Sequence, residues 1–140
     1  MTVIATISEG KSMAHRLGCI LLLSIIFTGC DRLTGCQQQE VLRVKSPDQQ
    51  VEAIVVERDC GATTSASKSI FLAPTGMEPN SDSPVFFADK IDGLDVQWQG
   101  SKVLAVEYTQ ARIHSFTNFW AVRELDNFEY EVKIVEREKK

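Results

Sequence analysis

The chain has 140 residues, a net charge of −4 and a hydrophobic content of 44%, which together suit one folded domain and exclude a disordered chain. The first 30 residues carry a net charge of +1 from Glu9, Lys11 and Arg16, so the remainder carries −5. An acidic surface of this kind argues against nucleic acid or anionic lipid as the main partner.

The first 29 residues have the layout of a secretory signal peptide and predict an N-terminal signal helix. From Met13 the sequence reads MAHRLGCILLLSIIFTGC, in which His15 and Arg16 form a basic start and residues 17–27 form an apolar stretch. That stretch is too short to span a bilayer, which takes about 20 apolar residues. The twelve residues before Met13 lack the pattern, which favours Met13 over Met1 as the start of translation.

The end of the apolar stretch, IIFTGC, resembles the lipobox of bacterial lipoproteins, in which a type II signal peptidase cuts before a cysteine that carries a diacylglyceryl group. Phe27 departs from this pattern, in which leucine is usual. The resemblance implies a diacylglycerol and an N-acyl chain on Cys30 and no other cofactor. A second match, LTGC, makes Cys36 the alternative, but Asp31 and Arg32 precede it, and charges at membrane depth cost roughly 2.5–3.5 kcal/mol each. An uncleaved anchor is the alternative to lipidation.

The lipobox resemblance also implies a location. Two or more acyl chains attach a protein durably to a membrane, so we expect a lipid-anchored protein of the bacterial cell envelope that faces the periplasm or the exterior. Asp31 after Cys30 resembles the inner-membrane retention signal of enteric lipoproteins, and the outer membrane stays open as the alternative. The polar residues that follow predict a lipidated tether over 30–39, before a single β domain over 40–140.

Short apolar segments separated by turn residues recur after residue 40, and none has a sustained helical period. In LDVQWQ and FEYEVKI, apolar and polar side chains alternate strictly, as in half-buried strands. VEAIVVE and KVLAVEY are apolar on both faces and are expected to be central strands. Gly100-Ser101 and Asp126-Asn127 are hairpin signals. The sequence therefore predicts an all-β domain, a small antiparallel meander that forms a sandwich or a partly closed barrel.

Two segments between the predicted strands are rich in turn formers. In CGATTSAS, residues 60–67, the glycine is suited to positive φ and the hydroxyls to hydrogen bonds with the nearby backbone. This turn is also the candidate contact with a partner, through Gly61, Thr63, Thr64 and Ser65. PTGMEPNSDSP, residues 74–84, holds three of the four prolines and predicts a long connecting loop.

The segment SPDQQVEAIVVERDCGATT resembles a stretch of small bacterial envelope proteins that have no assigned activity and share an SPD turn, an apolar strand and ERDCGATT. The likeness covers about 20 residues. It implies the fold and the location, and no reaction.

The four cysteines divide by position. Cys19 lies in the signal peptide and Cys30 in the lipobox, which leaves Cys36 and Cys60 in an oxidising compartment, where we expect them to form a disulfide. The alternative is a buried free Cys60 with Cys36 loose in the tether. That alternative is required if Cys36 carries the lipid.

No set of residues predicts a reaction or a metal site. A nucleophilic Cys60 needs a positive neighbourhood, but Glu57 and Asp59 lie close in sequence. His114 is the only histidine after the signal peptide, and no two His or Cys residues stand at metal-ligand spacing. We therefore predict no catalytic residue and no metal.

The expected function is a non-enzymatic binding or structural module that contacts an envelope protein or polymer. The alternative is a small inhibitor or immunity lipoprotein that blocks an envelope hydrolase with the 74–84 loop or the 60–67 turn. The late aromatic residues are expected to pack in the core, with a partner-binding patch as the alternative; they are Phe116, Phe119, Trp120, Phe128 and Tyr130.

Overall fold

The computed structural model describes residues 35–140. The predicted signal peptide and the lipidation of Cys30 lie outside the described residues and stay predictions. Residues Cys36–Lys140 form one compact unit. Nowhere in 35–140 is a helix long and apolar enough to cross a membrane.

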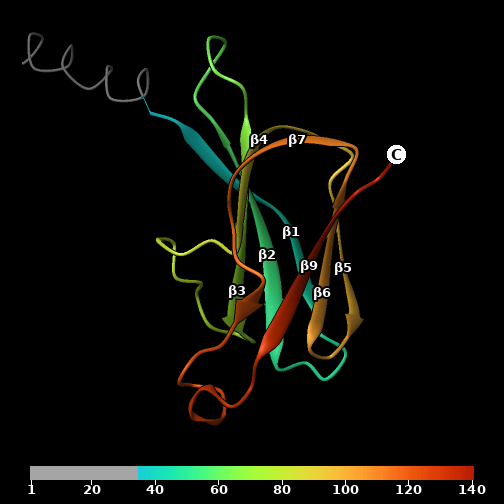
Figure 1. The fold of residues 1–140 in the computed structure, drawn as a ribbon. Helices are drawn as coiled ribbons and strands as arrows, with labels where there is room; N and C mark the ends of the chain where they lie inside the picture. Colours follow the sequence, from blue (N-terminus) through green and yellow to red (C-terminus); the bar gives the residue numbers. More distant parts are fainter. Residues whose placement is uncertain (1–34) are drawn as a thin grey trace, which may run out of the picture. The chain divides into compact units, whose positions relative to one another are not determined.

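Within residues 35–140 the chain forms nine strands in two sheets and one short 3-10 turn (Figure 1). The elements are β1 (Gln37–Lys45), β2 (Val51–Asp59), β3 (Ser67–Pro74), β4 (Phe86–Asp92), β5 (Asp95–Gly100), β6 (Val103–Tyr108), β7 (Gln110–Phe116), β8 (Phe119–Trp120), η1 (Asp126–Phe128) and β9 (Val132–Glu138). The first sheet has the order β1-β2-β3-β4-β7 and the second β5-β6-β9-β8. The all-β prediction is confirmed, as a two-sheet sandwich and not a closed barrel.

The predicted antiparallel meander holds in the first sheet, where β1 to β4 pair in chain order. It is wrong for the second sheet, because β6 and β9 pair in parallel, from Val103 opposite Lys133 to Tyr108 opposite Glu138. The reason is that β7 leaves β6 and pairs with β4 in the first sheet. The C-terminal strand β9 takes the free edge of β6.

The two hairpin signals differ in outcome. Gly100-Ser101 joins β5 to β6 in a tight antiparallel hairpin, as predicted. Asp126-Asn127 does not form a tight hairpin. It lies in the left-handed η1 turn, where both residues have φ of 49°, inside the long connection from β8 to β9. Aspartate and asparagine tolerate this left-handed backbone better than most residues, which suits them to a bend.

The chain passes between the two sheets at Gly93 and Thr109. Gly93 has φ of +63°, and a Cβ there would lie 2.8 Å from Thr109 Oγ1. Thr109 donates to the Asp92 carbonyl from its N–H (2.9 Å) and from its hydroxyl (3.0 Å). Glycine is therefore required at this crossing both by backbone conformation and by space.

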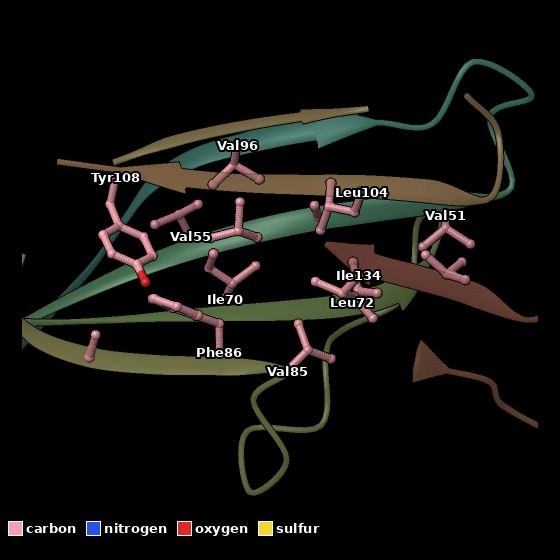
Figure 2. Close-up of a cluster of buried hydrophobic side chains, with 14 of the residues drawn as sticks. Val51, Val55, Ile70, Leu72, Val85, Phe86, Val96, Leu104, Tyr108 and Ile134 are labelled. Carbon is pink, nitrogen blue, oxygen red and sulfur yellow. The ribbon is translucent and has the colours of Figure 1, made fainter. Parts of the chain in front are cut away.

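The main core fills the space between the sheets (Figure 2). The first sheet contributes Val51, Ala53, Val55, Ile70, Leu72, Phe86 and Ala88, and the second contributes Val96, Leu104, Val106, Tyr108, Val132 and Ile134. The predicted inward residues of LDVQWQ and FEYEVKI are among them or, like Leu94 and Trp98, pack against them. Strict alternation correctly indicated a half-buried strand in LDVQWQ. In FEYEVKI it did so only for the last three residues, because β9 begins at Val132 and the residues before it lie in η1 and the connection that follows.

Strand β2 is buried on both faces, as expected of a central strand. Its other face carries Ile54, which is 1% exposed and packs with Phe71 and Ala73 of β3. Val56 packs against the same small cluster. We call this side of the first sheet, which faces away from the main core, its outer face.

The outer face also holds a buried carboxylate. Glu52 is 3% exposed and accepts from Arg43 of β1 at 2.7 Å, with Lys45 Nζ at 3.5 Å. The hydrogen bond from Arg43 lowers the pKa of Glu52 below its ordinary value, and burial opposes this effect. Two cations from one neighbouring strand thus compensate the buried charge, and they fix β1 beside β2.

The SPD turn between β1 and β2 ends in a hydrogen-bonded network. Ser46, which is buried, donates to Asp48 Oδ1 (2.6 Å) and accepts from the Val51 N–H (3.1 Å). The hydroxyl of buried Tyr130 donates to Asp48 Oδ2 (2.5 Å) and lies 3.0 Å from the Ser101 carbonyl oxygen. The network ties the first turn of the domain to the segment before its last strand.

Candidate functional site

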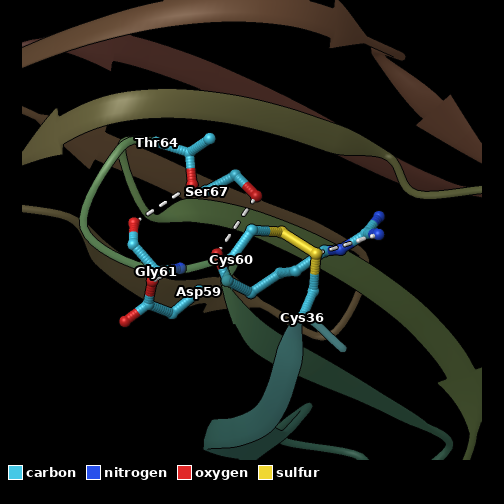
Figure 3. Close-up of a disulfide and its surroundings, with 7 residues drawn as sticks. Cys36, Asp59, Cys60, Gly61, Thr64 and Ser67 are labelled. Atoms are coloured by element: carbon cyan, nitrogen blue, oxygen red, sulfur yellow. Dashed lines mark hydrogen bonds between the residues drawn. A yellow bond between two sulfur atoms is a disulfide. The ribbon is translucent and has the colours of Figure 1, made fainter. Parts of the chain in front are cut away.

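Cys36 and Cys60 form a disulfide at the start of β1 and the end of β2 (Figure 3). Their Cα atoms are 4.0 Å apart, because the register sets the next pair, Gln37 and Asp59, opposite each other. The predicted pairing is confirmed. Residues 37–39 belong to β1, so the folded unit takes in part of the segment that the sequence assigned to the tether.

The turn after Cys60 is built as its sequence indicated. Gly61 has φ of 97°, and its N–H donates to Asp59 Oδ1 at 2.8 Å. The N–H and the hydroxyl of Thr64 both donate to the Gly61 carbonyl, at 3.1 and 3.3 Å (Figure 3). Residues 61–66 are exposed, so the turn projects from the end of the sheet. The side chains of Thr63 and Ser65 make no hydrogen bond within residues 35–140.

The loop between β3 and β4 forms a groove with the outer face of the first sheet. This outer groove has a volume of about 300 Å³. Its apolar lining consists of Val56, Phe71, Pro79, Pro84 and Phe87. Its polar lining consists of Gln38, Arg58, Ser67, Ser69 and Ser81.

Strand register explains why these side chains gather. Val56 pairs with Ser69, and Ser69 pairs with Phe87, so the three lie in one row across β2, β3 and β4. Arg58 and Ser67 form the adjacent row. Residues two apart on a strand point to the same side, so the two rows make a continuous surface with apolar groups beside hydrogen-bond donors.

The charge of the outer groove is positive. Arg58 is the one charged residue in its lining, and among residues 35–140 it makes no ion pair. Its Nη2 lies 3.4 Å from Cys36 Sγ, which holds the guanidinium at the disulfide end of the groove. The domain as a whole is acidic, so a groove lined by one arginine and no carboxylate differs in charge from the rest of the surface.

The nearest acidic group in the same row is occupied by other partners. Asp89, opposite Ser67 on β4, accepts from Arg112 of β7 and lies 3.3 Å from His114 Nε2. The hydrogen bond from Arg112 lowers the pKa of Asp89 to about 2. Asp89 is therefore ionised and held toward β7, and it leaves Arg58 available to another anion.

The 75–85 loop also borders a second hollow. This hollow, of about 430 Å³, lies between the loop and the segment after β8, with Met77, Glu78, Trp120 and Glu124 among its lining residues. The two hollows share no lining residue.

Cys60 and His114, the thiol and the imidazole considered for nucleophilic chemistry, have other partners. The Cys60 sulfur is in the disulfide, and His114 is paired with Asp89 and stacks near the Phe87 ring with centroids 5.1 Å apart. No group of three or more potential metal ligands is found within residues 35–140. The groove itself sets hydrogen-bond donors beside an apolar floor.

The late aromatic residues divide between core and surface. Trp120 packs against the core and Tyr130 is buried in it, as expected. The prediction is wrong for Phe116, Phe119 and Phe128, which are 37%, 55% and 53% exposed. The cause is position. Phe116 lies on β7, the edge of its sheet, and Phe119 on the two-residue edge strand β8, so no further strand covers them, while Phe128 lies in η1, which buries none of its residues.

The sequence analysis missed the outer groove. One signal was present: in VEAIVVERD, Ile54 and Val56 form a second apolar face that ends in Arg58. The rest of the lining comes from β3, β4 and the loop, and which strands adjoin β2 is a tertiary property. Comparisons of the chain with protein-family models, curated proteins and solved structures found no match.

Proposed function

We propose that this chain is a membrane-tethered lipoprotein of the bacterial cell envelope and that its β domain is a non-enzymatic binding module. The observation that carries the proposal is the Cys36–Cys60 disulfide. Disulfides persist in oxidising compartments outside the cytoplasm, where the IIFTGC pattern would deliver the chain.

The disulfide also bears on the choice of lipid acceptor. A sulfur that is bonded to another sulfur cannot carry a thioether-linked diacylglycerol. Pairing of Cys36 with Cys60 therefore favours Cys30 as the modified residue, with Cys36 as part of the fold.

The binding role is supported by the outer groove, which has an apolar floor and an Arg58 without an ion-pair partner among the described residues. Recognition sites commonly combine an apolar surface with a few well-placed polar groups. The partner we propose is an envelope protein or polymer.

Metabolic labelling with a fatty acid tests the lipoprotein assignment. Wild type and Cys36→Ala are expected to incorporate label, whereas Cys30→Ala is not. Label that survives in Cys30→Ala and disappears in Cys36→Ala would overturn both the anchor and the role of the disulfide. A wild type that takes up no label would exclude the lipoprotein.

A second candidate is an inhibitor or immunity lipoprotein that blocks an envelope hydrolase. The observation that favours it is the exposed 61–66 turn, which projects from the sheet end as a free tip (Figure 1). Pull-down from envelope extracts, with wild type and with residues 62–65 replaced by glycine and serine, separates the two. A stoichiometric hydrolase that depends on the turn supports inhibition, and a partner that is indifferent to it supports the first proposal.

A further inference from the structure

We infer that the outer groove binds the C-terminal residue of a partner polypeptide, with the terminal carboxylate on Arg58 and an apolar side chain on the floor formed by Val56 and Phe87. This inference rests on the proposed binding function and names the ligand class for it.

The first step is charge complementarity. Every polar group that lines the groove is a cation, an amide or a hydroxyl, and none is a carboxylate. Arg58 has no acidic partner among residues 35–140, and Asp89, in the same row, is already paired with Arg112. A guanidinium that lies beside an apolar surface and has no acidic partner among residues 35–140 suits a carboxylate, which it can bind through two parallel hydrogen bonds.

The second step is spacing. Arg58 and Val56 lie two residues apart on β2, which is about 6.8 Å along a strand. One C-terminal leucine or phenylalanine carries a carboxylate and an apolar side chain on the same Cα, so it can reach both. In an extended internal segment, adjacent side chains point to opposite faces. An internal acidic residue and the apolar residue directly next to it therefore cannot both enter. An acidic and an apolar residue two positions apart would have the same spacing as Arg58 and Val56, so it is the small size of the groove that argues against an internal segment.

The third step is size. A volume of about 300 Å³ lies at the small end of ligand sites, and it accommodates one or two residues of a peptide and not a long segment. Pro79 and Pro84 form part of its wall. Proline has no N–H, so this part of the wall offers no backbone donor to a ligand and favours apolar contact.

The test uses the full chain, purified in detergent, and isothermal titration calorimetry with two pairs of peptides. Each pair is Ac-Gly-Ser-Gly-Leu or Ac-Gly-Ser-Gly-Phe, with either a free C-terminal carboxylate or a C-terminal amide. The free acids are expected to bind with Kd below about 1 mM and the amides at least about tenfold more weakly. Acid and amide that bind alike, or no binding by either free acid at this concentration, would overturn the inference.

Two variants and a matched control locate the site. Arg58→Gln is expected to weaken binding of the free acid at least about tenfold, while Arg123→Gln, at an exposed arginine outside the groove that makes no ion pair within residues 35–140, leaves that affinity within about twofold. Gln38→Glu places a carboxylate in the lining without changing its size and is expected to weaken binding as well, so it decides the matter if Arg58→Gln fails to fold. If the folded groove variants bind the free-acid peptides with unchanged affinity, the inference is wrong.

A small carboxylic acid tests whether the carboxylate must belong to a polypeptide. N-acetyl-phenylalanine that binds as tightly as the tetrapeptide would mean that the groove takes a small amphipathic acid and not a polypeptide end. Failure of every ligand here, together with fatty-acid labelling at Cys30, would reject this inference and leave the proposed lipoprotein standing.

Discussion

The two ends of strand β2 are held by different means. At its N-terminal end Ser46 and Tyr130 are buried, and a hydrogen-bonded network through Asp48 joins residues 82 positions apart. At its C-terminal end the strand runs into solvent, and a disulfide with an exposed turn holds it. Hydrogen bonds are effective where apolar packing excludes water, whereas an exposed end has little packing to rely on and gains from a covalent link.

Removal of the covalent link is expected to have the largest effect. In the chain-entropy treatment a disulfide with a sequence separation of 24 contributes about 3.5 kcal/mol. Cys36→Ser with Cys60→Ser should lower the free energy of unfolding by that amount in urea titration. Reductant should lower the stability of wild type equally and leave the double variant unchanged. A loss below about 1 kcal/mol would contradict this contribution.

The buried end should be less sensitive to a single change. Tyr130→Phe removes the donor to Asp48 and keeps the ring in the core, so we expect a loss of about 1–2 kcal/mol by the same titration. Phe128→Leu, at an exposed aromatic residue nearby in sequence, is the control and should change stability by less than about 0.5 kcal/mol. If Tyr130→Phe lowers the free energy of unfolding by more than removal of the disulfide does, the N-terminal end of β2 is the more sensitive of the two.

The exposed turn should tolerate most substitutions except at its glycine. Gly61 has φ of 97° and open space around a Cβ, so Gly61→Ala is expected to cost about 1 kcal/mol through backbone conformation alone. Thr63→Ala, two residues along, should stay within about 0.5 kcal/mol in thermal unfolding at equal concentration. Equal effects of the two changes would argue against a conformational requirement at Gly61.

Acid should reduce the stability contributed by the Asp48 network at the N-terminal end of β2. It should leave the disulfide at the C-terminal end unaffected. Burial raises the pKa of Asp48, but hydrogen bonds from Ser46, Tyr130 and Gln50 outweigh it, so the folded pKa lies below the ordinary value. The ionised Asp48 therefore contributes to the free energy of unfolding above about pH 4, and this contribution is lost as the pH falls through the pKa of Asp48 in the folded state. The difference in urea midpoint between pH 6 and pH 3 should be smaller in Asp48→Asn than in wild type. If Asp48→Asn and wild type show the same difference in urea midpoint, Asp48 does not cause this pH dependence of stability.

Much of the fold could be predicted from local pattern. Alternation located β5 in LDVQWQ and the buried residues of FEYEVKI, although β9 begins only at Val132, and apolar runs on both faces located β2 and β6 as interior strands. The disulfide followed from the number of cysteines and the expected compartment. The positive φ of Gly61 followed from residue type. The strand pattern and the conformation of Gly61 depend on a side chain and its immediate neighbours, whereas the cysteine pair was inferred from a count and a compartment.

Partner choice between strands could not be predicted in this way. The parallel pairing of β6 with β9, the return of β7 to the first sheet, and the exposure of Phe116 all depend on which strand occupies each sheet edge. The outer groove has the same origin, because Arg58 meets Ser67, Phe87 and the loop only after β2, β3 and β4 assemble.

The sequence by itself determined the all-β class of the domain and the inward residues of the alternating segments, because these follow from side-chain period. It favoured the Cys36–Cys60 pair but left a free Cys60 as the alternative, and the structure decided between them. Only the tertiary structure decided the sheet order, the Gly93 crossing and the outer groove. Backbone hydrogen bonds between strands are alike in every pairing, so their choice is made by packing across the whole core.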